Sequence, residues 1–145
     1  MATALDTAEF FLALGARAGT LDLTNLKLQK LVYYAQGFHL GIFDVPLFRE
    51  DIHAGTWGPV VPGLYRHYAR LGQAPLGAPG YDASGRFTRE QRGLLTRVFG
   101  VFSPFSGEQL RAMTRNEPPW LQHERTASVI PQTALREYFE ARAQG

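Results

Sequence analysis

The sequence predicts a compact, mainly α-helical single domain, over residues 1–145, of five to seven helices with at most a short β-hairpin or extended segment. Three observations support this prediction. Apolar residues recur at steps of three and four along most of the chain, which is the spacing of one helix face. Ser, Thr or Asp precedes Gln or Glu by three residues at several places, as in a helix-capping box. The length suits one domain with its own core.

Two helices are predicted in the first part of the chain. Asp6 followed by Glu9 resembles a capping box, so the first helix is expected over about residues 7 to 18 and should end near Gly19. Thr24 can cap the second helix. The main apolar stripe of this second helix consists of Leu28, Leu31, Val32, Ala35, His39 and Ile42.

The second helix also carries large side chains on its other side. Leu26, Tyr33 and Leu40 lie opposite the main stripe at about 100° per residue, with Lys30 among them. A helix that is apolar all round is usually central in its domain. The polar ends of Lys30, Tyr33 and Tyr34 require either solvent or a defined acceptor.

The middle of the chain is punctuated by Gly and Pro. Ile52 to Trp57 is expected to be a short extended piece. The third helix is expected within residues 60–71, opened by Pro59 and Pro62 and stopped by Gly72. Its predicted inner face consists of Val60, Leu64, His67, Tyr68 and Leu71. Residues 73–85 are predicted to form a loop, with a small hairpin as the alternative.

Three further helices are predicted in the last part of the chain. Thr88 with Gln91, and Ser106 with Gln109, fit the capping-box pattern, and Pro104 separates the two helices that they start. Pro131 can occupy the first position of a last helix. That helix carries Leu135, Tyr138 and Phe139.

Composition excludes several classes of protein. Without cysteine, the chain has no disulfide, catalytic thiolate or cysteine-based zinc site. No apolar run approaches the roughly 20 residues of a membrane span, so we expect a cytoplasmic protein without a targeting signal. Thirteen of the 15 basic residues are Arg, but a net charge of +2 is weak support for a nucleic-acid partner.

The four histidines are the obvious candidates for catalysis or metal binding, and no pair of carboxylates is singled out by its position. The chain has no His–Glu–x–x–His or similar spacing, and His39 on an apolar helix face is expected to be a core residue. His53 and His67, together with Asp51, form the alternative of an unrecognised enzyme. We expect no catalytic residue, no cofactor and no metal.

A basic, aromatic surface is the second alternative, because it would suit a nucleic-acid-binding regulator of its own operon. Its members would be Arg66, Arg70, Arg86, Arg89, Arg92, Arg97, Tyr65, Tyr68 and Tyr81. The absence of a DNA-reading helix pattern disfavours this reading. Tyr and Arg are also the residues that dominate protein interfaces. The predicted partner-binding residues are Lys30, Tyr33, Tyr34, Trp57, Tyr65 and Arg66.

Five short segments occur together in one order. They are LTNLKLQKLVYYAQG from residue 23, PLF from 46, GPVVPGLY from 58, TRNEPPW from 114, and I-P-x-x-x-L-x-x-Y-F from 130. Together they resemble the Panacea, or SocA-like, antitoxin domain family from about residue 8 to 140. The family pattern falls on Leu26, Leu28, Gln29, Lys30, Leu31, Tyr33, Tyr34, Gly58, Pro59, Val60, Val61, Tyr65, Glu117, Pro119 and Trp120.

The resemblance implies an antitoxin, not an enzyme, that neutralises a protein toxin encoded in an adjacent gene. Direct occlusion of the toxin and its delivery to a ClpXP-type protease are both open. Two positions depart from the family: Arg115 stands where relatives often have His, and Gly55, Thr56 and Trp57 replace a Trp–Lys–Tyr-like segment. The second departure alters the surface offered to a partner.

Overall fold

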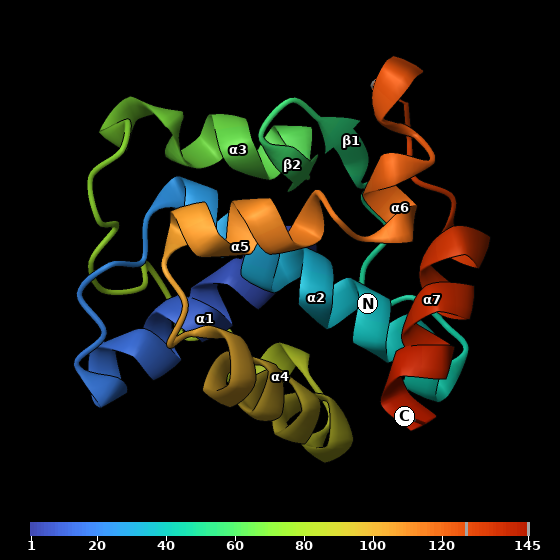
Figure 1. Ribbon diagram of the computed structural model, residues 1–145. Helices are drawn as coiled ribbons and strands as arrows, with labels where there is room; N and C mark the ends of the chain where they lie inside the picture. The colour runs from blue at the N-terminus through green and yellow to red at the C-terminus, as the bar shows by residue number, and fades with distance from the viewer. Residues whose placement is uncertain (127, 145) are drawn as a thin grey trace.

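A computed structural model describes residues 1–126 and 128–144 and confirms the mainly helical fold. Within these residues the chain forms seven α-helices and one small antiparallel sheet (Figure 1). The helices are α1 (Ala4–Ala18), α2 (Asn25–Phe43), α3 (Pro62–Tyr68), α4 (Arg89–Phe102), α5 (Gly107–Thr114), α6 (Pro118–Leu121) and α7 (Gln132–Gln144). The strands are β1 (His53–Gly55) and β2 (Gly58–Val60).

Helix α2 is the centre of the domain, as its two apolar sides predict. It contacts α1, α3, α4, α5, α7 and β2, and Figure 1 shows it running through the middle of the other helices. Leu28 and Val32 on one side, and Tyr33 and Leu40 on the other, are all buried. The expected stripe continues only to His39, because Ile42 in the last turn is 46% exposed.

The capping predictions hold for α2, α4 and α5 but not for α1. Thr24 caps α2 by accepting a hydrogen bond from the backbone of Lys27. Helix α1 begins three residues earlier than expected, because Thr3 is its N-cap and accepts from the backbone of Asp6. Asp6 closes the box from the third helical position, so its expected role as the cap itself was wrong.

The extended piece predicted before the third helix is the first strand of a hairpin. His53 pairs with Val60 and Gly55 with Gly58 across a tight turn. Val60 is therefore in a strand, and α3 begins only at Pro62. The shorter helix buries Leu64 and Tyr68 one turn apart.

Two other positions expected on the inner face of the third helix are exposed, so that part of the prediction was wrong. They are His67 and Leu71. His67 lies beside the buried i, i+4 pair on the solvent side of α3, and Leu71 belongs to a 3₁₀ turn that follows the helix. Residues 73–85 form no hairpin; they contain the start of a second 3₁₀ turn, Ser84–Arg86.

Helices α6 and α7 pack against each other (Figure 1). Trp120 in α6 is buried and donates its indole N–H to the carbonyl of Gly55 at 2.8 Å, which ties α6 to the hairpin. Helix α7 packs along α2 and carries the three predicted residues, of which Leu135 and Phe139 are buried and Tyr138 is partly buried. No helix among the described residues has the length and apolar character needed to cross a membrane.

Candidate functional site

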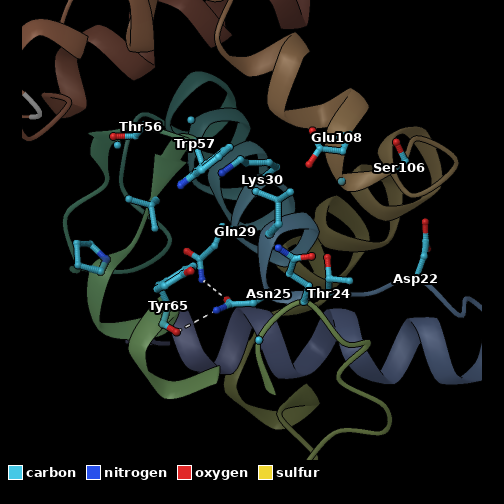
Figure 2. A pocket seen from close by; sticks show the side chains of 18 of the residues that line it. Asp22, Thr24, Asn25, Gln29, Lys30, Thr56, Trp57, Tyr65, Ser106 and Glu108 are labelled. Atoms are coloured by element: carbon cyan, nitrogen blue, oxygen red, sulfur yellow. Dashed lines mark hydrogen bonds between the residues drawn. The ribbon is translucent and has the colours of Figure 1, made fainter. Parts of the chain in front are cut away.

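A pocket of about 760 Å³ opens where the first turns of α2 face the hairpin turn, the start of α3 and the start of α5 (Figure 2). Its lining is mostly apolar. We call it the α2 pocket. Four of the six residues predicted to bind a partner line it: Lys30, Trp57, Tyr65 and Arg66. The structure thus brings together residues that are up to 36 positions apart in the sequence, without Tyr33 and Tyr34.

The hairpin turn places Trp57 at the edge of the α2 pocket. Trp57 is 62% exposed, so the turn does not anchor in the core through it. The Arg111 guanidinium lies 5.4 Å from the centre of the Trp57 ring, within the range of a cation–π contact. Arg111 also pairs with Glu108 at 2.9 Å. The exposed indole is therefore held by a side chain of α5.

Lys30 forms part of the pocket wall next to Trp57, as Figure 2 shows. Its side chain is 1% exposed, and its ammonium group donates to the carbonyl oxygen of Pro59 at 3.1 Å. Burial, and secondarily the positive charge of Arg111, lowers the pKa of Lys30 to about 7, although Glu108 opposes the shift. Strongly perturbed pKa values of this kind cluster at functional sites.

A chain of amide side chains fixes α3 against α2 at the other wall of the pocket. Gln29 donates to Asn25 at 3.0 Å, and Asn25 donates to the carbonyl oxygen of Tyr65 at 3.0 Å (Figure 2). Gln29 also accepts from the backbone N–H of Val61. These bonds fix the backbone of Tyr65 beside the pocket, where its side chain is 45% exposed.

Of the charged side chains that line the α2 pocket, the two acids have ion-pair partners among the described residues and the two cations do not. Asp22 pairs with Lys27 at 2.8 Å, and Glu108 pairs with Arg111. Lys30 and Arg66 have no acidic partner within 4.0 Å in the described part of the chain. The pocket therefore offers two cations whose charge is not already neutralised by a direct ion pair.

Tyr33 and Tyr34 lie elsewhere, in the core, where a partner cannot touch them in this fold. They donate to different oxygens of the Glu117 carboxylate, each at 2.7 Å. Arg142 of α7 pairs with the same carboxylate at 3.0 Å. Burial, and then the Glu117 charge, raises the pKa of both tyrosines. The sequence could not reveal this network, because Glu117 is 84 residues from Tyr33.

A second pocket, of about 420 Å³, is lined by His53, His67 and Asp51. It thus contains the three residues of the enzyme alternative. Glu50 lines it too, but its carboxylate already accepts from the backbone of Ala4 at 3.0 Å. Among the residues that the structure describes, no three His, Asp or Glu side chains are arranged to hold a metal ion. His39, by contrast, is buried and bonded to the carbonyl of Val45, as expected of a core histidine.

Several residues of the basic, aromatic surface considered above are bonded to acidic side chains of the same chain. Tyr68 is buried and donates to Glu9 at 3.1 Å, and Tyr81 donates to Asp6 at 2.7 Å. Arg86 lies 3.3 Å from the same Asp6. Two of the three tyrosines and one arginine of that set are therefore engaged with carboxylates, which weakens the case for a nucleic-acid surface.

One comparison with known proteins identifies the family. The family model described as antitoxin SocA-like, Panacea domain matches residues 28–121, well over half of the chain. The matched range contains Lys30 and the hairpin, together with Tyr65, Arg66 and Glu117. No curated protein and no solved structure matches the chain. The chain therefore belongs to the SocA-like antitoxin family with a Panacea domain, and this membership supports an antitoxin-type role.

Proposed function

We propose that this chain is a cytoplasmic antitoxin that neutralises a protein toxin, encoded in an adjacent gene, by binding it directly through the α2 pocket and its rim. Family membership supports the antitoxin part of this proposal. The observation that carries the binding surface is the grouping of exposed Trp57 and Tyr65 with Arg66 around a mostly apolar pocket. Tyr, Trp and Arg are the residues that contribute most to protein–protein affinity.

The rigidity of the rim favours binding as well. The Trp57 side chain is held by Arg111, and the backbone of Tyr65 is fixed by its bond to Asn25. An aromatic side chain that is already positioned, as Trp57 is, loses less conformational freedom when a partner arrives. A specific interface buries about 800 Å² on each partner. The rim would supply the central anchors of that area.

Tyr33 and Tyr34 are not part of the proposed surface. They build the scaffold through Glu117, together with Arg142. We propose that the whole chain, residues 1–145, acts as one domain without a catalytic step or cofactor. Occlusion of the toxin requires only this surface, whereas delivery to a ClpXP-type protease would require a second one.

Co-expression with the product of the adjacent gene tests the proposal. We expect the two proteins to co-purify and the antitoxin to restore growth. The double variant Trp57→Ala/Tyr65→Ala should lose both effects while keeping the helical circular-dichroism spectrum of the wild type. Val101→Ala, which shortens an exposed side chain on α4 outside the pocket, is the matched control and should behave as the wild type.

Two further arms separate the alternatives. The triple variant Asp51→Asn/His53→Ala/His67→Ala should neutralise as well as the wild type, since an antitoxin without catalysis does not use the second pocket. Rescue in cells that lack ClpXP would separate occlusion from delivery. Failure of the wild-type chain to bind or neutralise the adjacent gene product would refute the proposed function.

A further inference from the structure

The two lysines of the chain lie one turn apart on α2 and are both buried, yet within the described part of the chain only Lys27 has an acidic partner. Lys27 donates to Asp22 at 2.8 Å and to the carbonyl oxygen of Ser103 at 2.6 Å. Among the residues that the structure describes, the Lys30 ammonium group has a single hydrogen bond, to the carbonyl oxygen of Pro59. An ammonium group has three N–H donors, so most of the hydrogen-bonding capacity of Lys30 is unused.

The surroundings of Lys30 do not supply the missing acceptor. From α5, the charge of Glu108 favours the protonated form of Lys30, but Glu108 is paired with Arg111, whose own positive charge disfavours that form. From α3, Arg66 adds another cation. Asp22, before α2, is engaged by Lys27. The hairpin adds Thr56, Trp57 and Val60 to the lining but no charged side chain, so among the described residues the buried lysine of the α2 pocket has no direct ion-pair partner.

We propose that a carboxylate of the toxin enters the α2 pocket and pairs with Lys30, while apolar toxin atoms around it pack on Trp57 and the apolar lining. This inference rests on the proposed function and names the group that the pocket recognises. An ammonium–carboxylate pair in a site closed to water is a strong, charge-assisted hydrogen bond. The toxin would thus give Lys30 a carboxylate partner of the kind that Lys27 already has in Asp22.

The acids at the mouth of the pocket favour a carboxylate on a protein over a nucleic acid. Asp22 and Glu108 line the pocket with Lys30 and Arg66, so its formal charges are balanced overall. A polyanion requires many cations along its backbone, and its affinity falls steeply with salt. One carboxylate in a mostly apolar segment requires only one buried cation.

Pairing with a carboxylate would couple toxin binding to proton uptake. In the free protein, Lys30 has a pKa of about 7 and is largely neutral at pH 8. A carboxylate in the complex favours the charged form, so the complex should take up about one proton per toxin at pH 8. Below pH 7 the free protein already carries that proton, and the affinity should no longer change with pH.

The test measures the dissociation constant for the purified product of the adjacent gene between pH 6 and 9. For the wild type we expect little change below pH 7 and a weakening of up to about tenfold per pH unit above it. Lys30→Met should bind at least about tenfold more weakly at pH 7 and lose this pH dependence. Trp57→Ala, the control, should weaken binding by a similar factor at every pH.

A second measurement requires no substitution. Because the chain has only two lysines, ¹³C labelling of lysine gives two side-chain signals that can be followed by NMR as the pH changes. One should titrate near pH 7 in the free protein and well above it in the complex. Calorimetry at pH 8 in buffers of different ionisation enthalpy should report the same proton.

The outcomes separate this inference from the proposed function. Tight binding by both wild type and Lys30→Met, with equal pH profiles and an unchanged lysine signal, would overturn the role of Lys30 and leave the antitoxin function intact. Absence of any wild-type binding would remove both. Competition by duplex DNA at physiological salt would also overturn the inference, because the pocket would then bind phosphate.

Discussion

The Cβ atom that Gly58 lacks would lie 3.0 Å from Cε of Lys30 and 3.3 Å from its Nζ. It would also lie 3.0 Å from the hydroxyl of Thr114. Gly58 has a φ of 104°, in the region that favours glycine. The hairpin therefore rests directly on the buried lysine, and the burial of Lys30 depends on the absence of a side chain at Gly58.

We expect Gly58→Ala to lower the free energy of unfolding by about 1–3 kcal/mol, through backbone strain and crowding of Lys30. Urea denaturation measures this change. Gly93→Ala is the control, because it lies in α4 with open space around it and should raise stability by about 0.5–1 kcal/mol. Equal stability of Gly58→Ala and the wild type would show that the hairpin can move off the lysine at no cost.

The two tyrosines on Glu117 should differ in their contribution to stability. Among the described residues, one carboxylate oxygen accepts only from Tyr33, whereas the other accepts from both Tyr34 and Arg142. Tyr33→Phe therefore leaves a buried oxygen without a donor, at a cost of about 1–3 kcal/mol. Tyr34→Phe should cost less, because Arg142 remains. Urea denaturation of both variants checks the order, and the reverse order would contradict the network.

Most of the secondary structure could be predicted from the sequence, since caps and apolar spacing are local signals. Thr24, Thr88 and Ser106 cap helices as expected. The error at Asp6 arose because Thr3, three residues earlier, completes an equally good capping box with it. His67 was misplaced because positions three and four residues after Leu64 both fit a helical stripe, and the short helix buries only the second of them, Tyr68.

The candidate site could be predicted only in part, because local sequence signals do not record contacts between distant segments. Lys30, Trp57 and Tyr65 come from segments that the chain brings together through one hairpin, so their grouping follows from a short stretch of sequence. The burial of Tyr33 depends on Glu117, far along the chain, and no local pattern records that contact. Lys30 likewise has no ion pair among the described residues because the acids near the pocket pair with other residues: Asp22 with Lys27, and Glu108 with Arg111. The sequence does not indicate these pairings.

Helix α7 lies outside the range that the family model matches, yet it packs on α2 without a gap. A Cβ atom at Gly41 would lie 2.6 Å from both the backbone N of Glu140 and the carbonyl carbon of Phe139. Backbone atoms cannot rotate away as a side chain can. Gly41→Ala should therefore displace α7 and lower stability by about 1–3 kcal/mol or more.

Hydrogen exchange checks this expectation at the level of the helix. Amides of α7 should exchange faster in Gly41→Ala, and Arg142 should lose its contact with Glu117. Gly100→Ala, in α4 with open space around it, is the control and should leave α7 protected. Unchanged protection of α7 in Gly41→Ala would mean that the two helices can separate locally without loss of structure.

Because of Lys30, the free energy of unfolding should rise with pH, whereas a lysine in an ion pair would make it fall. Its pKa is lowered to about 7 by burial, from the value of 10.5 for an exposed lysine. Between these two pH values the unfolded chain holds a proton that the folded chain has released, so the free energy of unfolding should rise with pH. Below pH 7 both states hold the proton and the full cost of burying the charge is present.

Lys30→Met removes that charge and should therefore be more stable than the wild type at pH 6, by an amount on the order of a few kcal/mol. The difference should shrink steadily up to about pH 9.5. Urea denaturation at several pH values measures it, below the range in which ionisation of unfolded tyrosines lowers stability. Lys27→Met is the matched control: it leaves Asp22 and the Ser103 carbonyl without their donor and should destabilise the fold at every pH. A Lys30→Met variant that is less stable than the wild type by the same amount at pH 6 and pH 9 would show that Lys30 is not a buried, unpaired cation.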